Sequence, residues 1–571
     1  MSQLDWIILV LTLTGIITYG LYKSKTSRNL DGYFLSNRSM PWYLVLLSIM
    51  GTQASAITFL SAPGQAFTDG MRFVQYYFGL PIAMVVLCIT FVPIFHRLKV
   101  YTAYEYLEQR FDIKTRTFTS LLFLVSRGLS TGISIYAPSI ILSSLMGWDI
   151  FWTNIVMGGL LIIYTVSGGA RAVAYTQQLQ LIIIFVGMFL AGYMIVRLLP
   201  ANMGFWDALQ ISGAAGKMNV ITTGITDTGF DWKDRYNLIS GTIGGFFLAL
   251  SYFGTDQSQV GRYLTAKNLT ESRMGLLMNG LVKVPMQFFI LLLGVLLFTF
   301  YQFQQAPIFY NQSVETRALQ TPAKEQLMQL SAQYEQKRQA LATAALEKLH
   351  ANEQVSSDLV KPYAEAMQTL QKQYKARIKE AVPDADTNDT NYIFLRFVID
   401  HLPVGLVGLL IAIIFLAAWG SIAAALNSLA SCTMVDFYLR FKKQTANPAS
   451  DESQYRMSKW LTFFWGVFCV ITAEFANGMG SLIEAVNILG SLFYGVILGI
   501  FLVAFYLKKV QGNAVFWAAV IGELLVIACF LMDRYNIIGL GFLWLNVVGA
   551  IAVVILALIL QPLLRKPITA Q

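Results

Sequence analysis

Histidine, cysteine and charged residues are all scarce in this chain, and each scarcity argues against a class of protein. The three histidines, His96, His350 and His401, are too dispersed to form a buried proton relay. The four cysteines fall inside apolar stretches and have neither the spacing of a disulfide framework nor that of a metal site. No nucleophile–base pair or glycine-rich phosphate loop stands out. The sequence therefore argues against an enzyme and implies no organic cofactor.

The low charge content has a second consequence, because it leaves long apolar runs. Charged residues make up 13% of the 571 residues and hydrophobic residues 56%, whereas an average soluble domain is about 25% charged. Apolar runs of roughly 18 residues or more predict membrane spans. Thirteen such spans are predicted, near 4–22, 41–67, 72–97, 116–146, 149–168, 171–199, 236–262, 272–302, 403–440, 456–476, 481–507, 513–532 and 539–562. We therefore expect an all-α polytopic membrane protein.

Lysine and arginine cluster between alternate spans, and this clustering predicts the orientation. The basic clusters lie at 23–38, 97–116, 171, 262–273, 440–456, 508–509 and 565–566. With thirteen spans, all of them fall on one side, which the positive-inside rule assigns to the cytoplasm. We expect the N-terminus outside and the C-terminus inside, in the plasma membrane of a bacterium, its inner membrane. A basic cytoplasmic surface also explains the net charge of +9 without a nucleic-acid partner.

One segment, residues 305–390, is polar and separates a membrane region at 1–304 from another at 391–571. Its leucines and alanines recur at helical spacing, and Pro322 and Pro362 suit helix starts. The pattern predicts a periplasmic hairpin of helices at about 322–357 and 362–381. Its charges nearly balance, which favours a solvated helix pair. A binding site for a periplasmic protein partner stays an open alternative.

The stretch from Gly51 to Gly64 does not fit a plain membrane helix. It combines small residues, hydroxyls, an amide and a Pro-Gly pair in an otherwise apolar span. Backbone groups freed at membrane depth are tolerated only where protein or a water-filled site satisfies them, and transporters build ion and substrate sites in this way. Small residues and hydroxyls recur in the ninth span, around Ser421, where a hard cation could find oxygen ligands. Close helix packing explains the same residues, so both interpretations stay open.

Ionisable residues inside spans are functional candidates because each is costly in lipid. Arg127, Asp256, Lys283 and Glu484 are the main ones. We expect Asp256 to brace a second helix break near Gly254, and Lys283 to hold either an ion pair or a ligand. Aromatic residues near the two breaks suit a pocket for a small polar solute. The candidate solute-binding residues are Gln53, Ser55, Thr58, Tyr76, Tyr77, Arg127, Tyr252, Lys283, Glu484 and Asn487.

Three motifs make the chain resemble the sodium:solute symporter family, which includes sodium-coupled sugar, proline and sialic acid transporters. They are the residues 164–177, YTVSGGARAVAYTQ; the residues 103–111, AYEYLEQRF; and the residues 426–431, LNSLAS, followed by Asp436. The resemblance implies a LeuT-type fold of two inverted five-helix repeats, the first at 41–199 and the second beginning at 236. It also implies a sodium-coupled symporter that works by alternating access.

The resemblance implies a sodium site as well. Its ligands would be the carbonyl groups of Gly51 and Ala54 on one broken helix, and of Ala417 and Gly420 with the Ser421 hydroxyl on the other. Many relatives have two serines where this chain has Gly420-Ser421, and most have an aspartate at the position of Gln177. These departures make a second sodium site unexpected and favour one sodium ion per solute.

The solute is expected to be a sugar or a sugar acid. Lys283 aligns with a sugar-binding lysine of bacterial sugar symporters, Tyr76 with their outer-gate tyrosine and Tyr252 with their inner-gate tyrosine. Yet Tyr77 replaces their sugar-binding glutamate, and Arg127 lies about one turn from the carboxylate-binding arginine of the sialic acid branch. Coupling to protons, a sodium-independent transporter and a substrate sensor on a transporter scaffold remain the alternatives.

Overall fold

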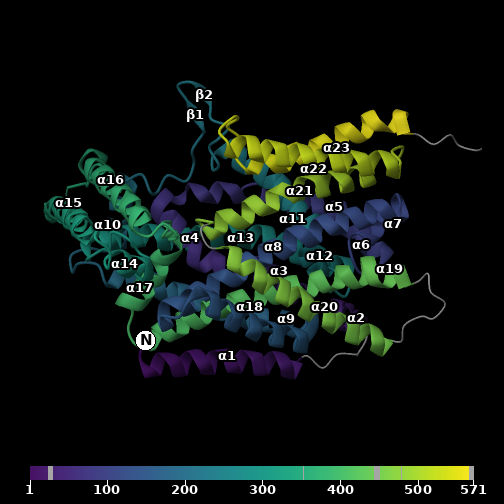
Figure 1. The fold of residues 1–571 in the computed structure, drawn as a ribbon, viewed down its shortest axis with the longest axis horizontal. Coiled ribbons are helices and arrows are strands. Elements are labelled where there is room, and N and C mark those ends of the chain that lie inside the picture. The colour runs from purple at the N-terminus through teal and green to yellow at the C-terminus, as the bar shows by residue number, and fades with distance from the viewer. Residues whose placement is uncertain (24–29, 352, 443–450, 477–478, 565–571) are drawn as a thin grey trace, which may run out of the picture.

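The protein is nearly all helical, and most of its helices run along the long axis of the molecule (Figure 1). The computed structural model describes residues 1–23, 30–351, 353–442, 451–476 and 479–564. The only strands in that part of the chain are the short antiparallel pair β1 (Ile225–Thr226) and β2 (Gly229–Phe230).

The helices of the first part of the chain are α1 (Gln3–Lys23), α2 (Leu30–Leu35), α3 (Trp42–Gln53), α4 (Ala56–Asp69), α5 (Leu80–Ile89), α6 (Phe91–Leu98), α7 (Glu105–Arg110), α8 (Ile113–Met146), α9 (Ile150–Arg197), α10 (Phe205–Ala214), α11 (Gly245–Thr255), α12 (Gln257–Tyr263) and α13 (Leu269–Phe303). Those that follow are α14 (Gln312–Ala318), α15 (Lys324–His350), α16 (Ser357–Ala381), α17 (Ile393–His401), α18 (Leu406–Cys432), α19 (Leu439–Lys442), α20 (Asp451–Ala473), α21 (Leu482–Tyr506), α22 (Gly512–Arg534) and α23 (Leu543–Leu564). A 3-10 helix (Met71–Tyr77) precedes α5, and a π-helical turn (Ser240–Gly244) precedes α11.

Ten helices of the described residues are long and apolar enough to cross a membrane, or eleven if α3 and α4 form one bent span. The count of thirteen spans stays a prediction. One difference lies in α9, whose 48 residues are assigned as a single helix. The Tyr164 and Thr176 hydroxyl oxygens nevertheless lie 2.6 Å apart, whereas twelve residues of straight helix rise about 18 Å. The chain must therefore turn back between these residues, as two separate spans require.

The predicted interruption of the second span is confirmed. Helices α3 and α4 are bent by 60° at a break, where Ala54 leaves helical geometry with φ −83° and ψ 78°. The amide of Ser55 donates to the carbonyl of Gln53 at 3.1 Å, so it no longer serves the carbonyl of Gly51, its partner in a regular α-helix. The break therefore frees backbone oxygen at this depth of the protein.

A second break separates α11 from α12 at Asp256. This residue has extended backbone geometry, and its Oδ1 accepts a hydrogen bond of 2.7 Å from the amide of Ser258. A side-chain acceptor at this position satisfies one of the free amides at a helix start. The bracing role expected of Asp256 is thus present. Each of the two expected repeats begins with an interrupted helix, although the boundaries at 41–199 and 236 stay predictions.

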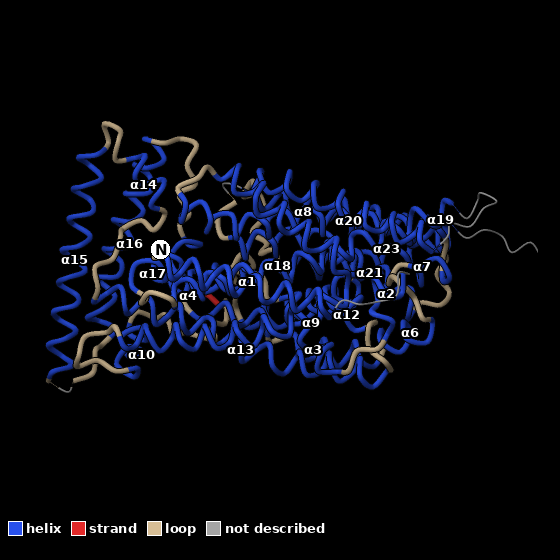
Figure 2. Tube along the Cα trace, turned by 90° about the horizontal axis from the view of Figure 1, so that it is seen from below, coloured by secondary structure: helices blue, strands red, loops and turns tan. Residues whose placement is uncertain are grey.

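The polar segment folds as a helical hairpin of α15 and α16 at one end of the molecule (Figure 2). We call this end the hairpin face, and the opposite end, where α6, α7 and α19 lie, the basic face (Figure 1). The hairpin docks on its own chain, because Arg338 Nη1 donates to the Gln302 carbonyl at 2.7 Å and Ser357 Oγ donates to the Ala214 carbonyl at 2.8 Å.

The predicted bounds of this hairpin were partly wrong. The first helix ends at His350 rather than near 357, and the second begins at Ser357, with Pro362 inside it. Ser356 is extended and Asp358 lies in the first turn, where a carboxylate interacts favourably with the helix dipole. These residues start the helix, and the proline is tolerated one turn later.

Close packing of α13 on α4 predicts a large effect for Gly294→Ala. A Cβ atom at Gly294 would collide with the carbonyl oxygen of Pro63, and overpacking of this kind costs about 1–3 kcal/mol. We expect a lower melting temperature for the purified variant in detergent. Gly159→Ala is the matched control, because nothing lies within 4 Å of its added Cβ atom. Equal melting temperatures for both variants would contradict the assigned contact.

Candidate functional site

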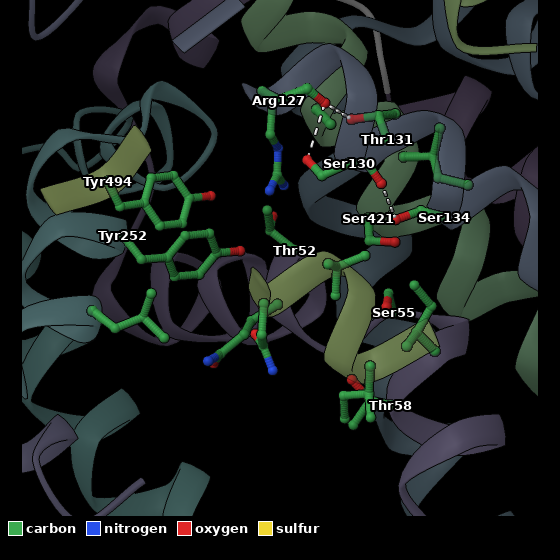
Figure 3. A pocket seen from close by; sticks show the side chains of 18 of the residues that line it. Thr52, Ser55, Thr58, Arg127, Ser130, Thr131, Ser134, Tyr252, Ser421 and Tyr494 are labelled. Carbon is green, nitrogen blue, oxygen red and sulfur yellow. Dashed lines mark hydrogen bonds between the residues drawn. The ribbon is translucent and has the colours of Figure 1, made fainter. Parts of the chain in front are cut away.

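A cavity of about 120 Å³ opens beside the break between α3 and α4. It is enclosed by this break, by the 3-10 helix before α5 and by α8, α11, α18 and α21. The polar residues that line it are Thr52, Gln53, Ser55, Thr58, Tyr76, Tyr77, Arg127, Ser130, Thr131, Ser134, Tyr252, Ser421, Asn487 and Tyr494. Figure 3 shows the rings of Tyr252 and Tyr494 on one side and the hydroxyls of α8 across from them. The wall thus combines aromatic surface with many hydrogen-bonding groups.

Most candidate solute-binding residues meet at this cavity, although they come from distant parts of the sequence. The residues brought together are Gln53, Ser55, Thr58, Tyr76, Tyr77, Arg127, Tyr252 and Asn487. Two connections help to close the cavity. Tyr76 Oη donates to Asn487 Oδ1 at 3.4 Å, which joins the 3-10 helix before α5 to α21. Gln259 Nε2 donates to Tyr252 Oη at 2.7 Å.

Three hydroxyls of α8 belong to the wall and were not among the sequence candidates. Thr131 Oγ1 and Ser130 Oγ donate to the Arg127 carbonyl at 2.6 and 3.2 Å, and Ser134 Oγ donates to the Ser130 carbonyl at 2.9 Å (Figure 3). Because each hydroxyl hydrogen is used by its own helix, the oxygen lone pairs remain to accept from a solute. Their signal in the sequence was the helical spacing of three, four and seven residues from Arg127.

Arg127 is the one charged side chain among the described residues that line the cavity. Its Nη1 lies 3.7 Å from Asp256 Oδ2, and its guanidinium lies 5.8 Å from the ring centre of Tyr252. The Asp256 carboxylate is shared, because Tyr494 Oη donates to the same oxygen at 2.9 Å. The Nε of Arg127 is buried and has no hydrogen-bond partner in the described part of the chain. The guanidinium is therefore only partly neutralised.

Lys283 lies outside the cavity wall. Its side chain is fully buried on α13, and its Nζ is 5.7 Å from the ring centre of Tyr77, a residue that does line the cavity. Among the described residues its Nζ has no hydrogen-bond partner and makes no ion pair. The structure therefore gives no support to a structural ion pair at this lysine.

Glu484 also lies away from the cavity, in a second and more open hollow near the hairpin face. Its carboxylate is paired with Arg235 at 2.7 Å and accepts from Tyr236 Oη at 3.2 Å. Arg72, which also lines this hollow, lies 3.0 Å from both Asp69 and Asp234. Glu484 thus ties α21 to the segment before α11 and does not line the cavity.

The expected sodium ligands sit where the break faces α18. Ser421 lines the cavity, and its Oγ donates to the Ala418 carbonyl at 3.0 Å, which leaves the oxygen lone pairs free for a cation. Gly51, Ala54, Ala417 and Gly420 do not line the cavity itself, and Ala54 and Ala417 are buried. Helix α18 packs against both α3 and α4. Backbone and hydroxyl oxygens of this kind suit a small hard cation.

Gln177 ties three helices together beside these residues. Its side-chain oxygen accepts from Ser48 Oγ at 2.8 Å, and its Nε2 donates to Thr52 Oγ1 at 3.2 Å and to the Gly420 carbonyl at 3.0 Å. An amide nitrogen is a donor only, so it occupies oxygens that a cation would otherwise need. The Gly420 carbonyl is thereby already engaged by Gln177.

The absence of a side chain at position 420 also has a steric reason. A Cβ atom there would collide with the side-chain oxygen of Gln180 and approach Gln177 Cγ to 3.3 Å. Gln180 therefore takes up the space that a serine side chain would need.

Comparison with known proteins identifies the class of protein to which this cavity belongs. The sodium:solute symporter family profile matches residues 33–325 and 368–522. The chain belongs to the sodium:solute symporter family. It is a sodium-coupled, multi-pass membrane transporter of a small solute and not an enzyme, which confirms the resemblance noted from the sequence. An inner-membrane location in bacteria is consistent with this class.

Two similar proteins cover nearly the whole chain. The sodium/sialic acid symporter of Proteus mirabilis is 26% identical over 96% of this chain and 93% of its own length. The sodium/sialic acid symporter of Aliivibrio fischeri is 25% identical over 100% of this chain and 95% of its own length. A solved Na⁺-coupled sialic acid symporter, in a substrate-bound outward-open state, has 24% identity and a TM-score of 0.75 over 99% of both chains. This structural likeness confirms the LeuT-type fold of the symporter.

Proposed function

We propose that this symporter imports a carboxylated sugar, of the sialic acid class, together with one sodium ion. The observation that carries the proposal is the partly neutralised Arg127 in an otherwise uncharged, hydroxyl-rich cavity. A guanidinium binds a carboxylate through charge-assisted hydrogen bonds, and its free Nε offers one of them. Two relatives that cover nearly the whole chain are sialic acid symporters, which supports the same substrate class.

The rest of the cavity suits the hydroxyls of a sugar. Gln53 and Asn487 bring amide groups, and α8 presents the oxygens of Ser130, Thr131 and Ser134. The Gln53 side-chain oxygen is buried without a hydrogen-bond partner in the described chain, so a solute hydroxyl could satisfy it. The rings of Tyr252 and Tyr494, inclined by 44° to one another, offer aromatic surface against which a solute ring can pack (Figure 3).

We assign the sodium ion to the gap between the α3–α4 break and α18, with the carbonyls of Gly51, Ala54 and Ala417 and the hydroxyl of Ser421 as ligands. Gly420 contributes less, because its carbonyl accepts from Gln177. Bound sodium would hold the break against α18 and complete the neighbouring cavity. Since coupling between two ligands is reciprocal, solute should tighten sodium binding by the same factor.

The membrane potential then drives import if the basic face is cytoplasmic, as the positive-inside rule predicts. A potential of about 100 mV contributes about 2.3 kcal/mol per sodium ion, which corresponds to roughly fifty-fold accumulation. In this orientation the N-terminus and the hairpin lie on the periplasmic side. A periplasmic partner for residues 305–390 stays a prediction.

Uptake by purified protein in proteoliposomes tests this function. We expect N-acetylneuraminate to be accumulated against its gradient when external sodium is present, and not when choline replaces sodium at fixed pH. Thermal stabilisation by N-acetylneuraminate should likewise require sodium, because a ligand stabilises only the state that binds it. Uptake that persists in choline would favour proton coupling, and flux without accumulation would indicate a sodium-independent transporter.

One sodium ion per solute is expected because an amide occupies the space beside Thr52 and Gly420. Gln177→Glu would place a carboxylate among the Ser48, Thr52 and Gly420 oxygens, an arrangement that suits a second cation. We expect the ratio of radioactive sodium to solute taken up to rise from one towards two. Gln177→Leu, which lacks the charge, should leave the ratio at one. A ratio of two in the unmodified protein would contradict the assignment.

A further inference from the structure

Helix α12 forms the layer behind the cavity on the way to the basic face. Its residue Gln259 holds the Tyr252 hydroxyl at 2.7 Å, and the Tyr252 ring lines the cavity. The helix packs against α3 and α18, the two helices beside the proposed sodium ion. The two helices α12 and α18 are also joined directly, because Ser428 Oγ of α18 donates to the Gln257 carbonyl of α12 at 3.4 Å. Helix α12 thus lies between the Tyr252 side of the cavity and the basic face (Figure 1).

Helix α12 is buried along its whole length and carries polar groups that lack partners. Arg262 is 1% exposed, and neither its Nε nor its Nη1 has a hydrogen-bond partner within the described residues. The same holds for Ser258 Oγ and Gln259 Oε1 on α12, and for Asn427 Oδ1 on α18. Spacings of three and four residues place Ser258, Gln259 and Arg262 on one side of the helix. Polar groups without partners are thus gathered on α12 and on α18, which packs against it.

An unpaired buried guanidinium is costly, and the neighbouring charges do not relieve the cost. Asp256, which begins this helix, is shared between Arg127 and Tyr494. No ion pair involves Arg262 in the part of the chain that the structure describes. On the opposite side of the cavity, by contrast, Arg72 and Arg235 are each paired with a carboxylate. The unsatisfied charge is thus on the side of the cavity that faces the basic face.

We propose that Arg262 lines the exit route for the solute and receives its carboxylate after it leaves Arg127. The inference rests on the proposed function, since it needs an anionic solute and a cytoplasmic basic face. An anion that leaves Arg127 must cross a layer of low dielectric, where an opposite charge is strongly favourable. When α12 separates from α18, Arg262 offers this charge, and Ser258, Gln259 and Asn427 offer hydrogen bonds. Arg262 should therefore govern release and not binding.

The test separates binding from turnover in Arg262→Gln. In proteoliposomes we expect the saturated rate of N-acetylneuraminate uptake to fall about tenfold or more, as the loss of a charge-assisted contact implies. The affinity for N-acetylneuraminate added on the side of the hairpin face, measured in the presence of sodium, should change by less than about twofold. Arg262→Lys, which keeps the charge, should restore much of the rate. The matched control is Arg273→Gln, because Arg273 also lies towards the basic face but donates to the Cys88 carbonyl.

Two outcomes overturn the inference while leaving the proposed function intact. They are an unchanged rate in Arg262→Gln, and an affinity that falls by the same factor as the rate. Absence of sodium-dependent binding in the unmodified protein would instead overturn the proposed function, and this inference with it.

If the glutamine variant fails to fold, Ser258→Cys tests the route without altering Arg262. We expect a membrane-impermeant thiol reagent applied from the basic face to label this cysteine when sodium is withheld, and less when sodium is present. Absence of labelling in both conditions would overturn the exit route.

Discussion

Arg127→Gln is expected to weaken sodium-dependent binding of N-acetylneuraminate by about ten- to a hundredfold. The substitution removes the one charged group that lines the cavity among the described residues. Hydrogen bonds to charged groups contribute about 1.5–3 kcal/mol, and each 1.4 kcal/mol corresponds to about a factor of ten in affinity. Isothermal titration of the purified protein at saturating sodium measures the change directly.

The single variant also leaves Asp256 without its cation, and breaking a buried pair is itself destabilising, by about 3–5 kcal/mol. The double variant Arg127→Gln, Asp256→Asn removes both charges and is the matched control. An asparagine can still begin α12, because its side-chain oxygen caps a helix as well as an aspartate does. We expect the double variant to regain thermal stability but not affinity. Recovery of the affinity for N-acetylneuraminate would show that Arg127 only stabilises the break between α11 and α12 through Asp256.

The sequence predicted correctly that the second span is interrupted, but not every residue taken as a sign of the interruption takes part in it. Small and hydroxyl residues from Gly51 onwards indicated an interruption, and the chain bends between Gln53 and Ala56. The Pro63–Gly64 pair, which was part of the same signal, lies inside α4 and does not interrupt it. A Cβ atom at Gly64 would collide with the Thr390 carbonyl. This glycine therefore reflects a contact with distant chain, which the local sequence does not reveal.

The candidate site likewise depends on contacts between distant parts of the chain, which the local sequence does not reveal. Residue type singled out Arg127, Asp256, Lys283 and Glu484 as candidates, but not the direction in which each side chain points. Lys283 lies outside the cavity lining, next to Tyr77, and Glu484 lies in the hollow near the hairpin face, because helix rotation and bending are set by packing of the whole bundle. The hydroxyls of Ser130, Thr131 and Ser134 on α8 are the opposite case, because they line the cavity but were not chosen from the sequence. Serine and threonine are common in membrane helix contacts, so their helical spacing from Arg127 was a weak signal, and their position across from Tyr252 is what places them at the cavity.

Ser421→Ala is expected to raise the sodium concentration for half-maximal uptake by about tenfold or more. The hydroxyl is the one side-chain ligand in the proposed sodium site, and its oxygen is free because its hydrogen is donated to the Ala418 carbonyl. A contact between an ion and this dipole is comparable to a hydrogen bond to a charged group, about 1.5–3 kcal/mol. Sodium titrations of initial uptake rate at saturating N-acetylneuraminate measure the shift.

Ser431→Ala is the matched control, because Ser431 is buried on the same helix but does not line the cavity. Its sodium requirement should be unchanged. Ser421 lines the cavity, so its hydroxyl could also contact the solute. The two roles differ in whether saturating sodium restores the affinity for the solute. If Ser421 binds sodium, the solute affinity of Ser421→Ala should return to normal at high sodium, as reciprocal coupling requires. A solute affinity that stays weak at every sodium concentration would assign Ser421 to the solute and leave the ion without its hydroxyl ligand.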